Sequence, residues 1–600
     1  MARFRPRLFF AFDGKVSRWY NRFMNDGKET ESTMARSGGR TPMKVMPLSG
    51  PAGDSLAERF RRGDPDVCAL FGFHPSRAGD WRRRADRLDE TAPLRANRER
   101  LAAALGAAGA RHGYGASAEP SLRKLRQPGC LVVVGGQQAG LFGGPLLVFY
   151  KALAVIRTAA AAERMLGRPV VPLFWIAGED HDFAEANVTH VLSPDGAVRQ
   201  IRLEGVAGGR HAVSRTPVPA SAWEDALDRL ARALPDSAHK PALLAGLRET
   251  IADAPTLTVA FARLLDAWLG GEGLLIMDAD DPEIRRLEGA FFRELAERSG
   301  ELAEALAEGE RRVRALGFAP QAETPEDGAH LFVHHPMGRL LLYRKGDGFA
   351  DRRGFFRADR AELAAMAENE PERFSTGALS RPLMQDFLLP VLATVLGPAE
   401  IAYWGQLGPA FERFGIGMPV IVPRPSFTFL EPWTESLLGE LGLTPEEAIW
   451  RWEERRAAWL ESLEEKGWDE RYRAVREGIA ALYDPLLKEL DAAETGLGDL
   501  GRKNLARILE QVAYLERRTR EAFLRRHEAS LRRWDRVRAA LCPMGRPQER
   551  VLGAIHFLNA YGPSWIGAWT GTDMDAEGGH MLVRFDTAAK EVCRLGSCEN

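Results

Sequence analysis

The sequence predicts an α/β fold built on a parallel β-sheet, and three observations carry this prediction. Residues 131–134 and 170–176 are continuous apolar runs, as is typical of strands buried on both faces. A helix predicted near 145–166 separates them, and two parallel strands require such a crossover. A later apolar run at 274–281 ends in acidic residues and opens a helix at Pro282, a residue favoured in the first helical turn. This alternation predicts a parallel sheet covered by helices.

The composition is that of a globular protein and excludes several functional classes. The chain has 600 residues, 45% hydrophobic and 27% charged, a length that fits about 3–4 domains or one large core with insertions. The net charge of −2 provides no general attraction for nucleic acid, and no apolar run approaches the ~20 residues of a membrane span. Five scattered cysteines without a CxxC pair indicate the reducing cytoplasm.

Changes in composition predict the domain boundaries. The first 42 residues are basic and lack the apolar centre of a secretory signal, so we expect a disordered extension. Two segments that differ in pattern from the core strands are expected to interrupt the core. The predicted parts are the disordered extension (1–42), N-terminal helices with the first half of the core (43–204), a helical insertion (205–262), core (263–328), a second insertion with a hairpin (329–374), core (375–440), a helical coiled coil (441–545), and a C-terminal helix and tail (546–600).

Local patterns predict the elements between the core strands. Residues 53–128 are rich in arginine and alanine, which favours helices. An apolar run at 188–192 ends in a Pro-Asp-Gly turn at 194–196. Residues 330–334 and 339–344 alternate around a turn and predict a β-hairpin.

Two apolar stripes predict a pair of long helices near the C-terminus. Glycines between the stripes would turn the chain, giving an antiparallel helical hairpin. The stripes could equally pack against each other or form a dimer interface. Their members are Val475, Ile479, Leu482, Leu486 and Leu490, and then Leu505, Ile508, Val512, Leu515, Thr519 and Ala522.

A glycine-rich loop follows the first core strand and carries two adjacent amides. Its glycines would let the backbone approach a ligand, and the next helix N-terminus favours an anion. It lacks the Lys-Ser/Thr of a P-loop and the G-x-G-x-x-G spacing, and its amides suit a neutral group such as a sugar hydroxyl. A tight turn without a ligand is the alternative. The candidate substrate-binding residues are Gly136, Gln137, Gln138, Gly140, Gly143 and Gly144.

Four consecutive ionisable residues follow the second core strand: Glu179, Asp180, His181 and Asp182. Like charges so close need compensation, from a substrate ammonium, a metal or an arginine. His181 could act as a general base near neutral pH, or could merely cap a helix. No second His/Asp set has a recognisable ligand spacing, so we assign no metal ligands. The same peptide supplies Trp175 and Asn187 as candidate substrate contacts.

Similar polar groups are expected at further strand ends. Ser380 and Arg381 precede a predicted helix, and the planar guanidinium of Arg381 suits a carboxylate or a phosphate. Residues 400–407 are predicted to form an apolar strand that ends at Gln406. Arg424 and Ser426 are expected in a rigid loop between prolines. We expect these groups to meet in one site.

Several peptides together resemble the bacillithiol biosynthesis cysteine-adding enzymes, a family of cysteine ligases. The most distinctive are 135-GGQQAGLFGGPL-146 and 173-LFWIAGEDHDFAEAN-187. The others are Tyr150-Lys151-Ala152, 317-GFAPQ-321, 376-TGALSRPLMQD-386, 397-GPAEIAYWGQL-407, 418-MPVIVPR-424 and 548-QERVLGAIHFLNAYG-562, so that the resemblance covers about 135–562.

The resemblance implies a Rossmann-type core similar to class I aminoacyl-tRNA synthetase catalytic domains, with connective-peptide insertions. It also implies a C-terminal coiled coil that forms a homodimer. The implied reaction joins the carboxyl group of cysteine to the amino group of glucosaminyl-malate. No HIGH-like or KMSKS-like peptide is present, so the cofactor is left open, with ATP or another activating nucleotide as an option.

The resemblance also implies roles for the candidate residues. The glycine loop would hold the sugar or an activating phosphate. Asp180, His181 and Asp182 would be catalytic, binding the ammonium of cysteine or accepting the proton of the attacking amine. Arg381 and Arg424 would hold malate carboxylates or phosphates. Replacing His181 by Ala should then abolish product formation without affecting folding.

The C-terminal block and two other functions remain as alternatives. Gln548, Glu549, Arg550 and Tyr561 could form a second ligand pocket, or could be a helix cap with an ion pair. A metal-dependent hydrolase using the acidic cluster is one competing function. A non-catalytic coiled-coil scaffold is the other.

Overall fold

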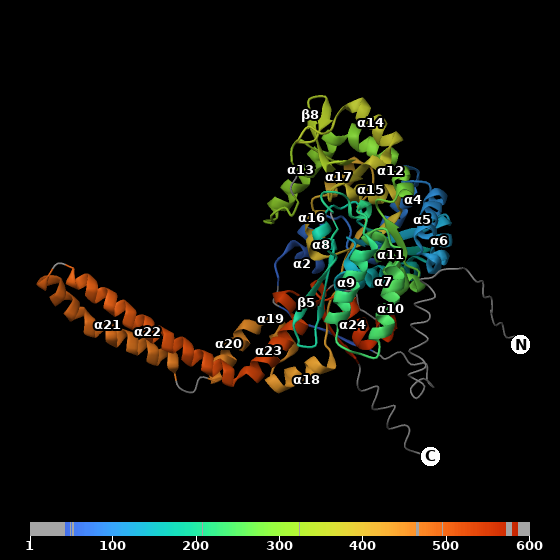
Figure 1. The fold of residues 1–600 in the computed structure, drawn as a ribbon. Helices are drawn as coiled ribbons and strands as arrows, with labels where there is room; N and C mark the ends of the chain where they lie inside the picture. Colours follow the sequence, from blue (N-terminus) through green and yellow to red (C-terminus); the bar gives the residue numbers. More distant parts are fainter. Residues whose placement is uncertain are drawn as a thin grey trace, which may run out of the picture. The chain divides into compact units, whose positions relative to one another are not determined.

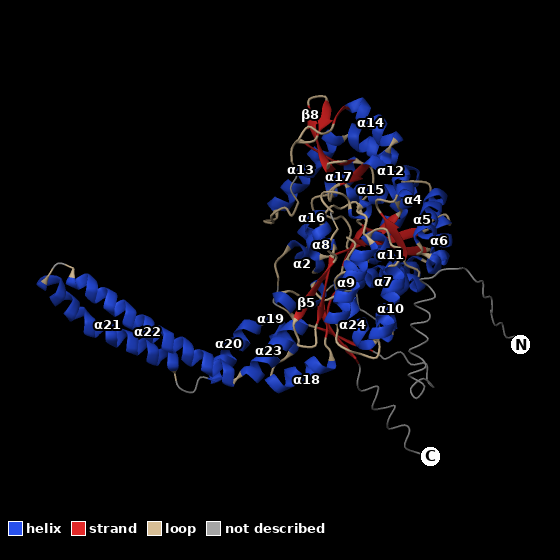
Figure 2. Cartoon of the chain, in the orientation of Figure 1, coloured by secondary structure: helices blue, strands red, loops and turns tan. Residues whose placement is uncertain are grey.

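The computed structural model describes residues 43–48, 50, 53–206, 208–322, 325–463, 467–494, 496–571 and 579–585. The predicted extension at 1–42 lies outside the described residues. The chain divides into two compact units, one formed by Met1–Leu430 with Arg546–Asn600 and the other by Glu431–Gly545. Figure 1 follows the chain through both units, and Figure 2 distinguishes their helices from their strands.

A five-stranded parallel sheet forms the centre of the first unit and confirms the predicted fold class. Its strands stand in the order β13-β12-β2-β3-β6. Numbered by position in the chain, this order is 5-4-1-2-3, the doubly wound arrangement of Rossmann folds. The strands are β2 (Leu131–Gln137), β3 (Val170–Ile176), β6 (Leu275–Asp278), β12 (Val391–Leu396) and β13 (Val420–Pro423).

Apolar side chains on both faces explain why these segments are strands. Every residue of β3 is buried. On one face, Val132 of β2 and Leu173 of β3 belong to a core cluster with Leu101 of α5 (Arg98–His112) and Leu125 of α6 (Glu119–Arg126). On the other face lies the crossover helix α7 (Leu146–Leu166), and Gly135 leaves the space that Val155 of α7 occupies.

The segments around the sheet contain the expected helices, together with one sheet that the sequence did not indicate in full. Helices α2 (Leu56–Arg61), α3 (Pro65–Cys68) and α4 (Ala78–Glu90) come before α5. Helices α9 (Ala220–Ala233), α10 (Lys240–Ile251) and α11 (Leu257–Leu269) occupy the first insertion.

The predicted hairpin of the second insertion is part of a larger antiparallel sheet. Strands β7 (Gly328–His335) and β8 (Gly338–Lys345) form the hairpin. They pair further with β9 (Gly348–Ala350) and β11 (Phe374–Thr376), and β10 (Arg357–Asp359) completes the order β10-β9-β8-β7-β11. The sequence identified only the two longest strands, because three-residue strands carry almost no periodic signal.

Two element predictions were wrong. Residues 400–407, predicted as a strand, lie largely in helix α16 (Pro398–Trp404). Pro398 opens this helix, and Glu400 accepts a hydrogen bond of 2.7 Å from the N–H of Gly397, so start signals override an apolar run. Residues 423–428, predicted as a rigid loop, overlap strand β14 (Ser426–Phe429).

Two smaller sheets complete the first unit. Strand β4 (Val188–Leu192) pairs antiparallel with β5 (Val198–Arg202) and is not part of the parallel sheet. Strand β14 pairs with β15 (His580–Phe585), which also pairs with β1 (Met43–Pro47). The segment that follows the coiled coil therefore returns to the first unit.

The second unit is helical and confirms the predicted coiled coil. Its helices are α18 (Pro432–Leu441), α19 (Pro445–Trp450), α20 (Trp452–Leu463), α21 (Trp468–Ala493), α22 (Leu497–Arg526) and α23 (Glu528–Leu541). Helices α21 and α22 run antiparallel (Figure 1), and the hydroxyls of Tyr472 and Thr519 lie 2.7 Å apart between them. Among the described helices of the whole chain, none has the length and apolar character needed to cross a membrane.

Candidate functional site

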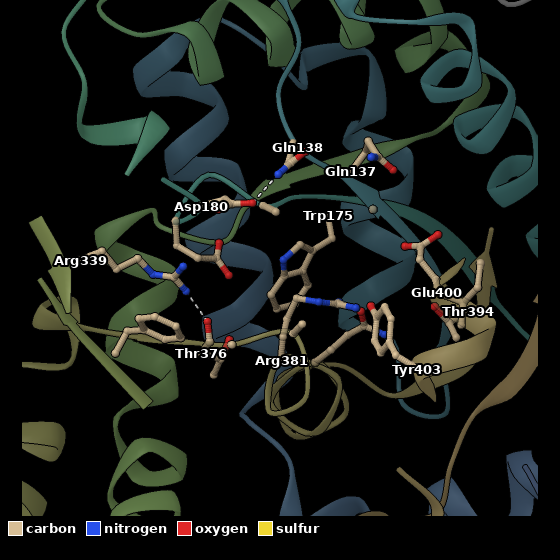
Figure 3. Close-up of a pocket in the computed structure, with 18 residues that line it drawn as sticks. Gln137, Gln138, Trp175, Asp180, Arg339, Thr376, Arg381, Thr394, Glu400 and Tyr403 are labelled. Carbon is tan, nitrogen blue, oxygen red and sulfur yellow. Dashed lines mark hydrogen bonds between the residues drawn. The ribbon is translucent and has the colours of Figure 1, made fainter. Parts of the chain in front are cut away.

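A cavity of about 320 Å³ lies at the carboxyl ends of β2, β3 and β12 (Figure 3). The strand order reverses between β2 and β12, and open α/β sheets bind ligands at such a switch point. The hairpin β7–β8 of the second insertion also contributes to the wall. The lining residues are Gly136, Gln137, Gln138, Trp175, Ala177, Glu179, Asp180, Phe332, Arg339, Thr376, Gly377, Ala378, Arg381, Gln385, Thr394, Leu396, Glu400 and Tyr403.

A buried lysine holds one side of this cavity. Lys151 of α7 is 1% exposed, and its Nζ donates to Gly136 O at 2.7 Å, Gln137 Oε1 at 3.1 Å and Glu400 Oε2 at 2.6 Å. Burial lowers the pKa of Lys151, and the carboxylate of Glu400 opposes that shift. The three bonds tie the end of β2 to the start of α16.

The second glutamine is held by a carboxylate. Gln138 Nε2 donates to Asp180 Oδ2. Asp180 Oδ1 accepts a hydrogen bond of 2.7 Å from the N–H of His181. Asp180 is therefore a fixed acceptor at the end of β3.

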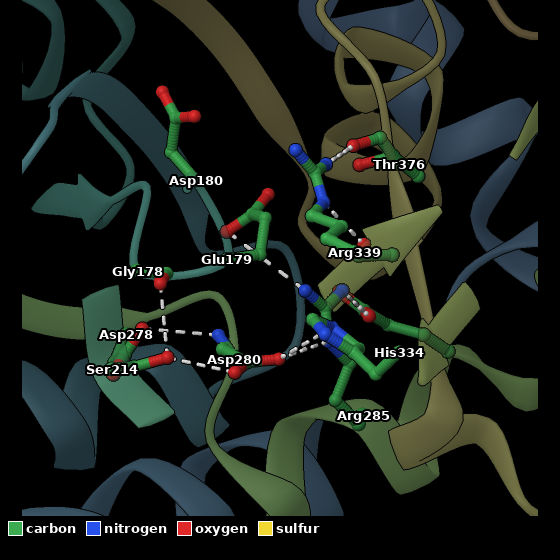
Figure 4. A network of polar contacts seen from close by, with 12 residues as sticks. Gly178, Glu179, Asp180, Ser214, Asp278, Asp280, Arg285, His334, Arg339 and Thr376 are labelled. Carbon is green, nitrogen blue, oxygen red and sulfur yellow. Dashed lines mark hydrogen bonds and ion pairs between the residues drawn. The ribbon is translucent and has the colours of Figure 1, made fainter. Parts of the chain in front are cut away.

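Glu179 begins a buried charge network behind the cavity (Figure 4). It is 4% exposed, and its Oε2 lies 3.8 Å from Arg285 Nη2. Burial raises the pKa of Glu179, while Arg285 lowers it only in part. A carboxyl group in this state takes up a proton more readily than an exposed one.

Two further carboxyl groups of this network, those of Asp278 and Asp280, have pKa values shifted in opposite directions. Burial raises the pKa of Asp278 well above its usual range. Burial would also raise the pKa of Asp280, but His334, Arg215 and the charge of Arg285 hold it well below the usual range. Arg215 Nε lies 2.6 Å from Asp280 Oδ2, so Asp280 remains charged and anchors the arginines behind Glu179.

Two arginines make the opposite side of the cavity basic. Arg339 of β8 donates to Ser375 Oγ at 2.9 Å and to Thr376 O, and its Cζ lies 3.9 Å from the centre of the Phe332 ring. Arg381, the first residue of α15 (Arg381–Leu388), donates to Gln385 Oε1 at 2.8 Å. Its Cζ lies 5.8 Å from the Trp175 ring, a cation–π distance.

Four buried polar atoms of the cavity wall have no hydrogen-bond partner within the described residues. They are Trp175 Nε1, Glu179 Oε2, Thr376 Oγ1 and Gln385 Nε2. Buried polar groups are normally paired, so these atoms are available to a polar ligand. The wall thus offers donors and acceptors as well as both signs of charge.

His181 and Asp182 do not join Asp180 in the cavity wall. The strand ends at Ile176, and the following turn leaves the His181 side chain 46% exposed. Asp182 caps the short helix α8 (Phe183–Ala186) by accepting from the N–H of Glu185 at 3.0 Å. Asn187 ends that helix and donates to Leu203 O at 3.4 Å. Of the predicted catalytic residues, only Asp180 lines the cavity.

The glycine loop serves mainly packing. Gly143 N donates to Gly140 O and Gly144 N to Leu141 O, both at 3.0 Å. The N–H of Leu146, at the start of α7, donates to Leu552 O at 2.8 Å. A Cβ on Gly143 would collide with Trp268. These amides are therefore not free to bind an anion, contrary to the expectation from the sequence.

Two more predicted residues lie away from the cavity wall. Ser380 Oγ donates to His330 O at 2.6 Å and accepts from Gly377 N at 3.0 Å, which shapes the turn before α15. Gln406 is fully buried beside Gly309, because the helix α16 carries it away from the strand ends. Trp175, Glu179 and Arg381, by contrast, are brought together as expected.

Arg424 and Ser426 are engaged by Glu549. Arg424 donates to Glu549 Oε2 at 3.0 Å and to Oε1 at 2.6 Å, and Ser426 Oγ donates to Oε1 at 2.9 Å. Gln548 accepts from Phe429 N at 2.8 Å and donates to Phe429 O at 3.0 Å. These four residues fasten the segment after the coiled coil to β14 and do not line the cavity.

A second cavity lies on the other side of the glutamine pair. It has a volume of about 200 Å³ and is lined by Gln137, Gln138, Gly140, Glu185 and Arg550, among others. The predicted second pocket is thus represented by Arg550 alone. Tyr561 instead packs against aromatic rings, with its ring centre 5.0 Å from that of Phe585.

The sequence missed Lys151, Arg339 and Glu400 as individual site residues. Lys151 had a readable signal, since it is the only charged residue in the apolar stretch 146–156. Arg339 and Glu400 come from elements far along the chain and had no such signal. Within the described part of the chain, no group of three or more His, Cys, Asp or Glu side chains is arranged to hold a metal ion.

Comparisons with known proteins agree with this architecture. A family model described as "Bacillithiol biosynthesis BshC, N-terminal Rossmann-like domain" matches residues 43–425. Another, described as "Bacillithiol biosynthesis BshC, C-terminal coiled-coil domain", matches residues 427–585.

Curated relatives extend over most of the chain, and each is named "Putative cysteine ligase BshC". The protein of Geobacillus thermodenitrificans (strain NG80-2) is 33% identical over 547 residues, which cover 90% of this chain and all of the relative. That of Symbiobacterium thermophilum is 35% identical over 513 residues, or 82% of this chain and 91% of the relative. These names indicate a ligase with a role in bacillithiol biosynthesis and do not favour a metal-dependent hydrolase. The chain belongs to the bacillithiol biosynthesis BshC family.

Proposed function

We propose that this ligase joins the carboxyl group of cysteine to the amino group of glucosaminyl-malate, the last step of bacillithiol synthesis. One observation carries the proposal: a single cavity at the switch point combines two arginines with three carboxylates. Cysteine brings an ammonium and a carboxylate, and malate brings two carboxylates. A cavity with both signs of charge suits this pair of substrates better than it suits substrates that carry charges of one sign only.

The basic side of the cavity is proposed to bind the malate group. Arg381 retains N–H groups beyond the one that reaches Gln385, and its planar fork suits a carboxylate. Arg424 is not proposed for this role, because Glu549 already accepts its N–H groups.

The acidic side is proposed to handle the two amino groups. Asp180, fixed by Gln138 and by the backbone of His181, holds the ammonium of cysteine. Glu179, whose pKa is raised by burial, accepts the proton that the sugar amine loses as it attacks. Both carboxylates come from the same strand end, so the two amino groups are brought close to each other.

Amide formation from a free carboxylate also requires an activating co-reactant, and we propose a nucleoside triphosphate. The carboxyl oxygen of cysteine would leave with phosphate or with a nucleoside monophosphate when the amine attacks. Purified protein should therefore be incubated with glucosaminyl-malate, cysteine and ATP, and the mixture analysed by mass spectrometry. A ligated product together with either AMP or ADP supports the proposal, and no product from any nucleoside triphosphate refutes it.

A matched pair of variants tests the role of the basic side. Arg381→Ala should raise the KM for glucosaminyl-malate by roughly 10- to 100-fold, since a hydrogen bond to a charged group is lost. Arg123→Ala, on the exposed surface of α6, is the control and should leave KM unchanged. Equal KM values for the two variants would contradict the assignment of Arg381.

We also propose that two chains associate through the coiled coil. Members of each predicted stripe such as Ile479 and Val512 are half-buried, but Leu482 remains 76% exposed and Leu515 57% exposed. Exposed apolar side chains grouped on one helical hairpin mark an interaction surface. Leu482→Glu should convert a dimer to a monomer in light scattering, and an unchanged mass would contradict the proposal.

A further inference from the structure

The two adjacent glutamines of the cavity are held in opposite orientations. Gln137 places its Oε1 3.1 Å from Lys151 Nζ. An ammonium group has only donors, so the atom facing Lys151 must be the amide oxygen. The Nε2 of Gln137 consequently faces away from the lysine, and within the described residues it donates to no protein acceptor.

Gln138 is arranged the other way round. Its Nε2 donates to Asp180. This contact engages the amide nitrogen of Gln138. Its Oε1 accepts no hydrogen bond from the described residues.

Glu400 completes the arrangement beside Gln137. Its Oε2 accepts from Lys151 at 2.6 Å and from Gly397 N at 2.7 Å. Its other oxygen has no such bond among the described residues, and the side chain is 26% exposed in the cavity wall. Figure 3 shows Gln137 and Glu400 on one side of the cavity and Gln138 with Asp180 on the other.

We propose that Gln137 and Glu400 form a subsite for a neutral hydroxyl group, with Lys151 as the residue that positions both. A hydroxyl is at once a donor and an acceptor. It can accept from the N–H of Gln137 and donate to the free oxygen of Glu400. On the proposed function, on which this assignment rests, the group is a hydroxyl of the glucosaminyl ring.

The local charges select this ligand over an ionic one. A phosphate would face the carboxylates of Glu400, Asp180 and Glu185, and the glycine-loop amides are already bonded within the protein. An ammonium would find the carboxylate of Glu400 already paired with Lys151, and it has no acceptor for the N–H of Gln137. A neutral group with one donor and one acceptor avoids both disadvantages.

The test compares two ligands on matched variants by calorimetry. Gln137→Glu keeps an oxygen for Lys151 but removes the free N–H groups. It should weaken the binding of glucosaminyl-malate roughly 10- to 100-fold and that of malate alone less than about twofold. Gln127→Glu, the same change at the exposed residue that follows α6, is the control and should alter neither affinity.

Lys151→Met tests the positioning role, because it frees the side chain of Gln137 without removing any group from the cavity wall. A positioning role predicts a selective loss of affinity for glucosaminyl-malate, whereas a merely structural role predicts an equal loss for malate. Equal affinities of Gln137→Glu and the unmodified protein for glucosaminyl-malate would overturn the subsite. That result is distinct from failure of the proposed function, which appears as the absence of ligated product from the unmodified protein.

Discussion

The pairing of Arg424 with Glu549 allows a decisive test, because the sequence suggested substrate binding and the structure indicates a fastening role. Glu549 is 2% exposed and accepts four hydrogen bonds, two from Arg424, one from Ser426 and one of 3.0 Å from Phe427 N. We consider the change Glu549→Ala. It leaves the buried guanidinium without its counter-charge and a buried backbone N–H without its acceptor.

The magnitude follows from these lost partners. Removing one member of a buried ion pair costs about 3–5 kcal/mol. The orphaned N–H of Phe427 adds about 1–3 kcal/mol unless water reaches it. The combined change Arg424→Met with Glu549→Gln leaves no unpaired charge and keeps an oxygen for Phe427. We expect it to cost only about 1–2 kcal/mol, so the two sites should be strongly non-additive.

Hydrogen exchange of the peptides that contain Phe427 and Glu549 measures the loss of local stability in these variants. Each 1.4 kcal/mol is about tenfold in an equilibrium constant, so a loss of about 3–5 kcal/mol should accelerate exchange at least 100-fold. The double variant should exchange only about 5- to 30-fold faster than the unmodified protein. The fastening role is refuted if Arg424→Met exchanges hydrogen at the native rate but binds glucosaminyl-malate more weakly. Arg424 would then be a ligand-binding residue.

Three further predictions concern the cavity and its network. Asp180→Asn should lower kcat/KM by roughly 10- to 100-fold, whereas His181→Ala, outside the cavity wall, should retain most activity; the reverse order would restore His181 as catalytic. Gly178→Ala should lower thermal stability and activity together, because its Cβ would collide with the half-buried carboxylate of Asp278; a native melting curve would argue against this packing. Glu288 of α12 (Pro282–Glu297) lies 2.7 Å from Arg285, and burial raises its pKa from 4.5 to about 7 although Arg285 opposes the shift, so the stability contributed by its neutral form is complete below about pH 4.5 and is lost as the pH rises to 7. The side chain in Glu288→Gln cannot ionise. Between pH 4.5 and 7, its free energy of unfolding should therefore rise relative to that of the native protein by on the order of 3 kcal/mol. A difference that does not change with pH would exclude this titration.

How far the sequence could predict the site is clear from individual residues. Trp175 lies near the end of a strand whose apolar run is continuous, and Glu179 and Asp180 follow that strand, so their place at the cavity was predictable. Arg424 also follows a strand, yet its charge is neutralised by a residue 125 positions further along the chain. Position relative to a strand end is local information, while the partner of a charged side chain is not. The same limit explains Gln406, which a helix start at Pro398 carries away from the cavity.

Local patterns in the chain were enough to predict the parallel sheet, its crossover helix, the hairpin of the second insertion and the long antiparallel helices. These features depend on periodic burial and on start and stop signals, which act within some ten to twenty residues. Which polar groups meet depends on the three-dimensional fold. Lys151 joins Gln137 to Glu400, and Arg339 reaches the cavity from the second insertion. Electrostatic partners are chosen by distance in space and by burial, so no local pattern in the chain could specify them.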